Sequence, residues 1–388
     1  MHDLKSIPTK AYVVERKGAP FVLQDILLDE IQSHEVLVEM LYTGLCHTDI
    51  VVQHGGMPVG AYPAILGHEG VAVVRKIGLG VSNRRLLPGD IVILSFHSCH
   101  QCRYCQEGNL GGCTRMTEVN FIKTGRDGPG MNSPASLPDG TPVFAQFFGQ
   151  SSLSKLMVVP ESSVVKAELR LEDNLSCLPA LSCGYLTGAG TVFNALKPKP
   201  SDTVAVIGMG AVGFAALMAA RALGVEQVIA IDIVDEKLQM ATSLGASHTI
   251  NSSTPPDIKE GIRSIFPDGV DMIVEATGVA ILAETSVKAL AHGGTLALVG
   301  AFPPEADIKI NALDLLVSCK KIVGVIEGST NPHEMIPRLV ELYKQGKFPV
   351  EKLSKVYPAE HLDQALEDLK TGKVIKPVLS WKSVASSE

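Results

Sequence analysis

Short apolar runs, separated by glycine, proline and asparagine, dominate the first third of the chain. Apolar runs that are rich in β-branched residues and bounded by turn-forming residues predict β-strands. Clear examples are AYVVE at 11–15, EVLVEML at 35–41, GVAVVR at 70–75 and DIVIL at 90–94. We therefore predict a β-rich domain in this part of the chain.

The pattern changes at Thr203, where apolar strands begin to alternate with helical segments. Strands are predicted at 203–208, 227–232, 270–278 and 294–301. The intervening segments have helical patterns, for example DEKLQMATSL at 235–244. Alternation of strand and helix indicates a parallel sheet with crossover helices, so we predict a doubly wound α/β domain here.

The residues after about 330 do not continue this alternation. Two amphipathic helices are predicted at 337–345 and 361–369, followed by a closing strand at 376–381. We assign this tail to the first domain, so that the second domain is an insertion within it. The predicted domains are 1–184 with 328–388, and 185–327.

Composition and charge exclude several classes of protein. The chain is 46% hydrophobic with a net charge of -7, and its basic residues are scattered, so we expect no nucleic-acid partner. The apolar run at 203–220 resembles a short membrane span, but its spaced glycines favour a buried strand, a turn and a helix. Neither end carries a signal peptide or a lipidation address, so we expect a cytoplasmic protein without a membrane partner.

A glycine motif opens the second domain. Gly208, Gly210 and Gly213 form GMGAVG after an apolar strand and before a helix, and Asp232 ends the next strand. The glycines would make the turn, admit a pyrophosphate and let the helix pack on the strand. Asp232 would accept hydrogen bonds from the ribose hydroxyls and repel a 2′-phosphate, which favours NAD over NADP. A glycine turn without a ligand is the alternative.

Four of the eight cysteines lie within one short segment. They are Cys99, Cys102, Cys105 and Cys113. This spacing indicates a closed structural zinc site, because four thiolates complete a tetrahedral shell. The main alternative is a chance cluster of free thiols. An iron–sulfur cluster begins with the same spacing, but its usual spacing of the fourth cysteine is absent. We expect His97 and His100 to face solvent rather than to bind the metal.

A second, open metal site is suggested by Cys46 and His68. A catalytic zinc has three protein ligands and one exchangeable position. From the residues alone, the third ligand could be Cys177, Cys183 or Cys319. Taken alone, His68 would more often be a packed core histidine, and each lone cysteine a small buried hydrophobic residue.

Several motifs resemble those of the zinc-dependent medium-chain alcohol dehydrogenases. They are GLCHTD at 44–49, GHEG at 67–70, the four-cysteine segment, CGYLTG at 183–188 and GMGAVG. The likeness spans almost the whole chain, and GVIEGS at 324–329 and IPRLVELYKQGKFP at 336–349 resemble the aryl-alcohol (benzyl-alcohol) branch in particular. The resemblance implies a GroES-like, β-rich catalytic domain, a Rossmann domain, two zinc ions per subunit, and a dimer or tetramer.

The resemblance also implies roles for individual residues. The catalytic zinc ligands would be Cys46, His68 and Cys183. Glu69 would lie behind the metal, Asp49 would orient the histidine ligand or merely cap a helix, and Thr48 would contact the substrate oxygen. Around the cofactor, His47 would lie near the pyrophosphate, and Thr187 and Val212 near the nicotinamide.

Two positions depart from the better-known members of this family. Val51 replaces the histidine that passes the proton to solvent, so the proton would leave through Thr48 and the ribose, or through His47. His54 we interpret as a solvated loop histidine. Ser95 replaces a bulky aromatic residue, which would widen the substrate pocket, and Phe96 could line that pocket together with Phe144, Phe147 and Phe148.

We therefore predict an NAD-dependent zinc oxidoreductase of the alcohol dehydrogenase class (EC 1.1.1). Its expected reaction interconverts a primary aromatic or allylic alcohol and its aldehyde. The alternatives are a reductase of the same fold that tailors a fungal secondary metabolite, possibly with NADPH, and a noncatalytic dinucleotide-binding protein. The segment 120–141, dense in Gly, Pro, Asn and Asp, is predicted as a long surface loop and is closer to the dimeric pattern.

Overall fold

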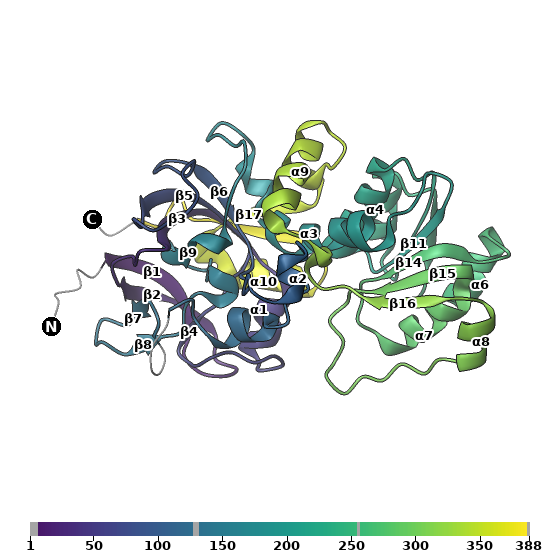
Figure 1. Ribbon diagram of the computed structural model, residues 1–388, viewed down its shortest axis with the longest axis horizontal. Helices are drawn as coiled ribbons and strands as arrows, with labels where there is room; N and C mark the ends of the chain where they lie inside the picture. Colours follow the sequence, from purple (N-terminus) through teal and green to yellow (C-terminus); the bar gives the residue numbers. More distant parts are fainter. Residues whose placement is uncertain (1–6, 127–131, 254–256, 386–388) are drawn as a thin grey trace. The chain divides into compact units, whose positions relative to one another are not determined.

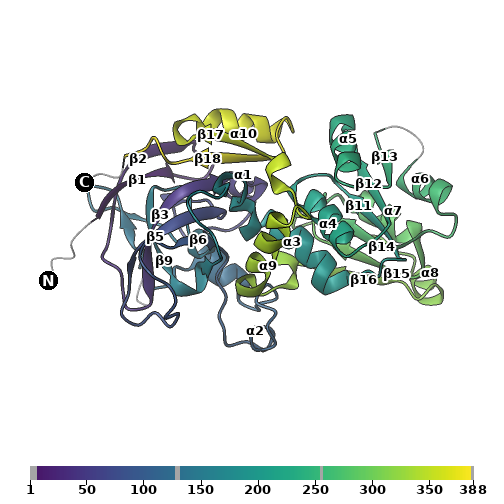
Figure 2. The same ribbon diagram turned by 90° about the horizontal axis from the view of Figure 1, so that it is seen from above.

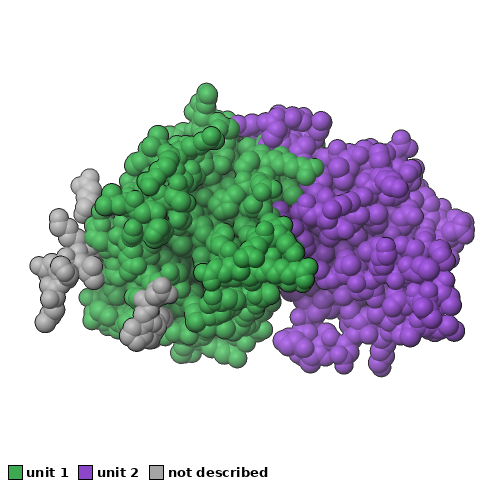
Figure 3. Space-filling view, in the orientation of Figure 1, with its two compact units in different colours: residues 1–183, 331–340, 350–388 green, residues 184–330, 341–349 purple. Residues whose placement is uncertain are grey.

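A computed structural model describes residues 7–126, 132–253 and 257–385 (Figure 1). The extreme ends of the chain, to which the expectations about targeting refer, and residues 127–131 of the predicted loop lie outside the described residues. The chain divides into two compact units (Figure 3). Unit 1 comprises 1–183, 331–340 and 350–388, and unit 2 comprises 184–330 and 341–349. The roles of these units in catalysis and cofactor binding stay predictions.

Unit 1 is built on two sheets of mainly antiparallel strands. Among the described residues, five strands pair in the order β4-β1-β2-β7-β8, and β10-β6-β5-β3-β18-β17 form a second sheet in which β9 also pairs with β3. The strands are β1 (Ile7–Val14), β2 (Phe21–Leu28), β3 (Glu35–Gly44), β4 (Ala64–Ile65), β5 (Gly70–Ile77), β6 (Ile91–Leu94), β7 (Ala135–Ser136), β8 (Pro142–Val143), β9 (Leu156–Pro160), β10 (Val164–Lys166), β17 (Ser354–Pro358) and β18 (Lys376–Ser380).

The strand β3 organises unit 1, because β5, β9 and β18 all pair with it. The pairing of β18 with β3 brings the last strand of the chain next to the end of β3, where Val378 is paired with Gly44. The helices of this unit are α1 (His47–Gln53), α2 (Arg103–Gln106), most of α9 (Pro332–Lys344) and α10 (Leu362–Lys370). Helix α10 lies along β17 and β18 (Figure 2).

Unit 2 is a parallel sheet with helices on both sides. The strands, in the order β13-β12-β11-β14-β15-β16 among the described residues, are β11 (Thr203–Ile207), β12 (Gln227–Asp232), β13 (His248–Asn251), β14 (Val270–Glu275), β15 (Leu290–Leu298) and β16 (Lys321–Gly324). The helices are α3 (Gly184–Gly190), α4 (Ala211–Ala222), α5 (Asp235–Ser243), α6 (Ile258–Ile265), α7 (Ala280–Ala289) and α8 (Ala312–Val317). Figure 1 shows α4 and α7 on opposite sides of the sheet.

The predicted fold class is confirmed: a β-rich unit is combined with a doubly wound parallel sheet. The central strands β11 and β12 read as continuous apolar runs because both of their faces are buried. The apolar run at 203–220 folds as β11, a turn and α4. Within the described residues, no helix has the length and apolar character needed to cross a membrane.

The prediction of a surface loop over 120–141 was wrong for its first residues. Residues Glu118–Ile122 form a helical turn, and Asn120 is fully buried. Its side-chain amide accepts from the N–H of His97 and donates to the carbonyl of the same residue. Arg126 is also buried, in ion pairs with Glu35 and Asp29. Polar composition does not report burial when the polar groups have partners.

Candidate metal and cofactor sites

Two groups of metal-binding side chains form in unit 1, as far as the described residues show. The first is the four-cysteine cluster, which surrounds α2. The Sγ atoms of Cys99 and Cys105 are 3.9 Å apart, and those of Cys102 and Cys105 are 3.5 Å apart. Ligand sulfurs of a tetrahedral zinc are about 3.8 Å apart, given Zn–S bonds of about 2.3 Å. Both separations are close to this value, and all four sulfurs lie within 4.8 Å of one another, so the cluster fits zinc.

Backbone N–H groups donate hydrogen bonds to sulfurs of this cluster. The Sγ of Cys113 accepts from the N–H groups of Cys99 and Arg115, and the Sγ of Cys99 accepts from that of Cys102. Hydrogen bonds from the backbone at Cys105 and Thr114 lower the pKa of Cys102 to about 5. Burial instead raises the pKa of Cys105 to about 12 and also raises that of Cys113. The prediction that both neighbouring histidines face solvent was wrong for His97, which is partly buried and bonds to Ser162, whereas His100 is exposed.

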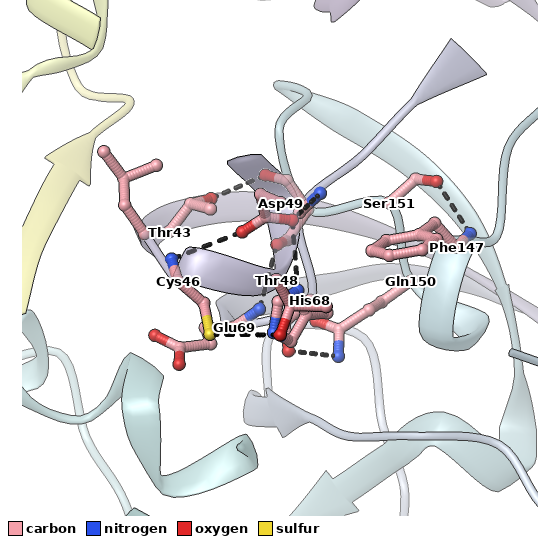
Figure 4. Close-up of polar contacts among 12 residues, drawn as sticks. Thr43, Cys46, Thr48, Asp49, His68, Glu69, Phe147, Gln150 and Ser151 are labelled. Atoms are coloured by element: carbon pink, nitrogen blue, oxygen red, sulfur yellow. Dashed lines mark hydrogen bonds and ion pairs between the residues drawn. The ribbon is translucent and has the colours of Figure 1, made fainter. Parts of the chain in front are cut away.

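The second group consists of Cys46, His68, Glu69 and Cys183, whose ligand atoms all lie within 4.8 Å of one another. Cys46 lies between β3 and α1, and His68 and Glu69 directly precede β5. Cys183 directly follows the short helical turn Pro179–Ser182. Of the three cysteines that could complete this site, the structure thus brings Cys183 to it. Figure 4 shows the other three residues of the group, Cys46, His68 and Glu69.

A hydrogen bond to Asp49 holds the imidazole of His68 through one ring nitrogen and leaves the other available to a metal. Its Nδ1 lies 3.1 Å from Oδ1 of Asp49, to which it donates, and the side chain is only 1% exposed. Its Nε2 is buried without a hydrogen-bond partner among the described residues. A buried ring nitrogen in this state costs free energy unless something coordinates it. The donor set of two sulfurs, a nitrogen and a carboxylate fits zinc.

Electrostatics within this group favour charged partners. A hydrogen bond with Cys183, together with the charge of His68, places the pKa of Cys46 well below its usual value despite burial. Burial alone would lower the pKa of His68, but the charges of Asp49 and Cys46 outweigh it and raise that pKa. Cys46 therefore has thiolate character, as a metal-binding cysteine requires.

Asp49 is both a helix cap and a partner of the histidine. Besides His68, its Oδ1 accepts from the N–H of Gly67 at 2.9 Å, and its Oδ2 accepts from the N–H of Cys46 at 3.3 Å. Asp49 thus both caps α1 and bonds to His68, and its role in orienting a zinc ligand stays a prediction. The same carboxylate links the two chain segments that carry Cys46 and His68 (Figure 4).

The first turn of α1 presents the remaining residues predicted around the substrate. Thr48 is partly buried, and its Oγ1 lies 3.6 Å from the Sγ of Cys46. His47 and Val51 are exposed. His54 is exposed at the end of this helix and its Nδ1 bonds to the carbonyl of Ile50, as expected for a solvated histidine.

Sequence reasoning missed a buried lysine next to this site. Lys376, at the start of β18, lies 2.8 and 2.9 Å from the two carboxylate oxygens of Glu69, and it donates to the carbonyl of Leu45 at 3.0 Å. Burial raises the pKa of Glu69, and the charge of Lys376 opposes that shift. Gly44 leaves room for the carboxylate, because a Cβ at that position would overlap it. The sequence signal that could have indicated this ion pair is a lysine at the start of an otherwise mostly apolar strand.

The glycine motif of unit 2 has the geometry of a dinucleotide-binding turn. Gly208 has a φ of 89°, which other residues rarely adopt, and a Cβ at Gly213 would overlap the carbonyl oxygen of Gly208. Nothing lies within 4 Å of the Cβ position at Gly210, so the backbone is open to a ligand there. Asp232 lies beside this turn, where its Oδ2 accepts from the N–H of Met209 at 2.6 Å.

The residues predicted around the nicotinamide belong to two helices in close contact. A Cβ at Gly188 of α3 would overlap the carbonyl oxygen of Val212 in α4. The adjacent Thr187 donates to Glu327 across 3.4 Å. Thr187 and Val212 thus lie on helices that pack together.

Comparison with known proteins identifies the family. The pattern described as "Alcohol dehydrogenase GroES-like domain" matches residues 32–169, and that described as "Zinc-binding dehydrogenase" matches residues 211–345. Geraniol dehydrogenase of Castellaniella defragrans is 34% identical over 380 residues, which cover 98% of this chain and 100% of that protein. The chain belongs to the zinc-dependent medium-chain alcohol dehydrogenases.

Solved structures of this family agree. Benzyl alcohol dehydrogenase of Acinetobacter calcoaceticus is 38% identical, with a TM-score of 0.89, over 96% of this chain and 99% of that one. A protein of Burkholderia ambifaria described as an alcohol dehydrogenase zinc-binding domain protein is 37% identical, with a TM-score of 0.92, over 97% and 99%. The predicted resemblance to this family, including its benzyl-alcohol branch, is thereby confirmed.

The residues predicted to line the substrate pocket are placed as follows. Ser95 is fully buried and its Oγ donates to the carbonyl of Ser182, next to Cys183, across 3.4 Å. Phe96 is also buried, whereas the rings of Phe147 and Phe148 contact His68 directly, with centroids 5.8 and 4.7 Å away. Phe147 and Phe148 therefore lie next to His68, and the roles of these residues in substrate binding stay predictions.

Proposed function

We propose that this alcohol dehydrogenase uses NAD to interconvert a primary aromatic or allylic alcohol and its aldehyde. The observation that carries the proposal is full-length similarity to one enzyme named for geraniol, an allylic alcohol, and to another named for benzyl alcohol. The aromatic rings around His68 support it, because they would offer flat apolar contacts to such substrates.

In this proposal, Cys46, His68 and Cys183 hold the catalytic zinc, and Cys99, Cys102, Cys105 and Cys113 hold the structural zinc. When bound, the catalytic zinc supplies a Lewis acid for the alcohol or carbonyl oxygen. The chain's own residues then do the positioning. Asp49 keeps the proton of His68 on Nδ1, so that Nε2 is free to coordinate.

The proton is handled by Thr48, whose Oγ1 would contact the substrate oxygen. No imidazole follows at position 51, so the proton would leave Thr48 through the cofactor ribose or through His47. In unit 2, the backbone between Gly208 and Gly213 would receive the pyrophosphate at the start of α4. Asp232 would accept from the ribose hydroxyls, and its negative charge supports the preference for NAD.

The test is a substrate panel of benzyl, cinnamyl, geranyl and short aliphatic alcohols, each with NAD and with NADP. The proposal requires the highest kcat/KM for an aromatic or allylic alcohol with NAD. Highest efficiency with ethanol or propanol would refute the substrate class, and a preference for NADP would refute the cofactor assignment. The variant Asp232→Ala provides a control, since it should reduce discrimination between the two cofactors.

A further inference from the structure

The chain before β9 adopts an unusual backbone conformation next to His68. Gln146, Phe148 and Ser151 have φ values of 66°, 52° and 44°, in the left-handed region that non-glycine residues rarely occupy. Such conformations persist only where surrounding contacts hold them, and they often mark functional sites. Here Ser151 supplies some of those contacts: its Oγ accepts from the N–H of Phe147 at 2.9 Å (Figure 4) and donates to the carbonyl of Ile65 at 2.6 Å.

This segment delivers one buried amide to the backbone of the metal-binding residues. Gln150 is fully buried; its Nε2 donates to the carbonyl of His68 at 2.7 Å, and its Oε1 accepts from the N–H of Gly70 at 3.1 Å. The side chain therefore brackets Glu69 from both sides, as the backbone of a neighbouring strand would. Both ends of the amide are used, so its orientation is fixed.

The neighbouring residues act on the same short stretch. Ser152 Oγ accepts from the N–H of Glu69 at 3.2 Å, and Phe148 stacks on the His68 ring. Ser182, which precedes Cys183, has its Oγ 3.2 Å from the carbonyl oxygen of His68, but it donates its proton to the nearer carbonyl of Pro179, at 2.7 Å. The backbone of His68 is thus fixed by Gln150, while its ring is fixed by Asp49.

We propose that Gln150 is a positioning residue of the catalytic metal site. Its amide fixes the backbone from His68 to Gly70, which keeps Nε2 of His68 in place for coordination. The left-handed conformations between Gln146 and Ser151 are maintained because they bring this amide and the Phe148 ring onto one ligand. This inference rests on the proposed role of His68 as a zinc ligand.

The test compares Gln150→Leu with Gln146→Leu in the zinc-loaded protein. Gln146 is the control: it is also buried, and its amide also bridges two backbone groups, the N–H of Gly125 and the carbonyl of Val158. Its backbone is left-handed, unlike that of Gln150, and its Nε2 has a further contact with Glu35 at 3.4 Å. It does not bond to a proposed zinc ligand. Release of each zinc to a chromogenic chelator is followed over time, and thermal unfolding is measured in parallel.

We expect Gln150→Leu to release the catalytic zinc about 10- to 100-fold faster, as is typical when a partner that orients a ligand is lost. Release from the four-cysteine site should not change. Gln146→Leu should lower thermal stability similarly but leave both release rates unchanged. Cobalt substitution gives a second readout, because a shifted ligand changes the visible absorption of the Gln150→Leu protein only.

Equal release rates for the two variants would overturn the proposal, as would a Gln150→Leu protein that releases zinc like the wild type. If Gln150→Leu does not fold, Gln150→Met, which keeps an unbranched side chain of similar length, replaces it under the same criteria. Failure of the proposed function is distinguishable: wild-type protein with two zinc ions but no alcohol oxidation would refute that function, while the comparison of release rates would still decide the role of Gln150.

Discussion

Lys376→Met should destabilise unit 1 strongly, because it leaves the carboxylate of Glu69 without its counter-ion. Both side chains are nearly inaccessible, at 3% and 0% exposure. Removing one partner of a buried ion pair costs about 3–5 kcal/mol, whereas replacing both with neutral groups of similar size is often close to neutral. We therefore expect Lys376→Met to lose about 3–5 kcal/mol and the double variant Lys376→Met/Glu69→Gln to regain most of that loss.

Trp381 provides the assay. It is the only tryptophan of the chain, and it directly follows the strand that carries Lys376. It is fully buried, and its Nε1 donates to Thr43 at 2.9 Å. Its fluorescence during guanidinium unfolding, at saturating zinc, therefore reports unit 1. A single variant within about 1 kcal/mol of wild type would refute the reasoning, since that is the range of exposed ion pairs. A double variant no more stable than the single one would do the same.

Three further results are expected. Zinc analysis should find two ions per wild-type chain and one ion per chain in both Cys46→Ser and Cys99→Ser. Only Cys46→Ser should lose activity while it stays folded. A zinc content that Cys46→Ser does not change would contradict the assignment of Cys46 as a zinc ligand. Val51→His should raise activity mainly at low pH, where proton release is most limiting, and an unchanged pH–rate profile would argue against that limitation. The Tyr357 hydroxyl, with nearby lysines, holds the pKa of Asp368 below its usual value of 3.8. Its ionised form thus stabilises unit 1 above pH 3.8, so the loss of stability in Asp368→Asn should shrink as the pH falls further, whereas a constant loss would exclude this linkage.

Sequence patterns predicted the elements of the fold well because they are local. The strands at 227–232 and 376–381 and the helix at 235–244 lie within a residue of their observed bounds. The four-cysteine cluster was equally accessible, since its ligands are close in sequence and need no tertiary information. The third ligand of the open site was different: three cysteines were equivalent by composition, and only the family resemblance singled out Cys183.

Lys376 and Gln150 escaped prediction for a physical reason. Each is a single polar residue that becomes important only because folding brings it next to a distant backbone or side chain. Lys376 meets Glu69 through the pairing of β18 with β3, and Gln150 meets His68 through a left-handed turn. No local periodicity reports such contacts, although a lone lysine in an apolar strand is a useful warning of a buried partner.

The two metal clusters differ in how much of the chain must exist before each can form. The four-cysteine cluster is complete within residues 99–113, so closing it orders only a short loop. The other cluster spans residues 46 to 183, and the carboxylate of Glu69 in it forms an ion pair with Lys376, near the carboxyl end of the chain. We therefore expect the four-cysteine cluster to be able to bind zinc while the chain is still being made. The cluster of Cys46, His68, Glu69 and Cys183 should reach its final form only after the last strand has been made and paired.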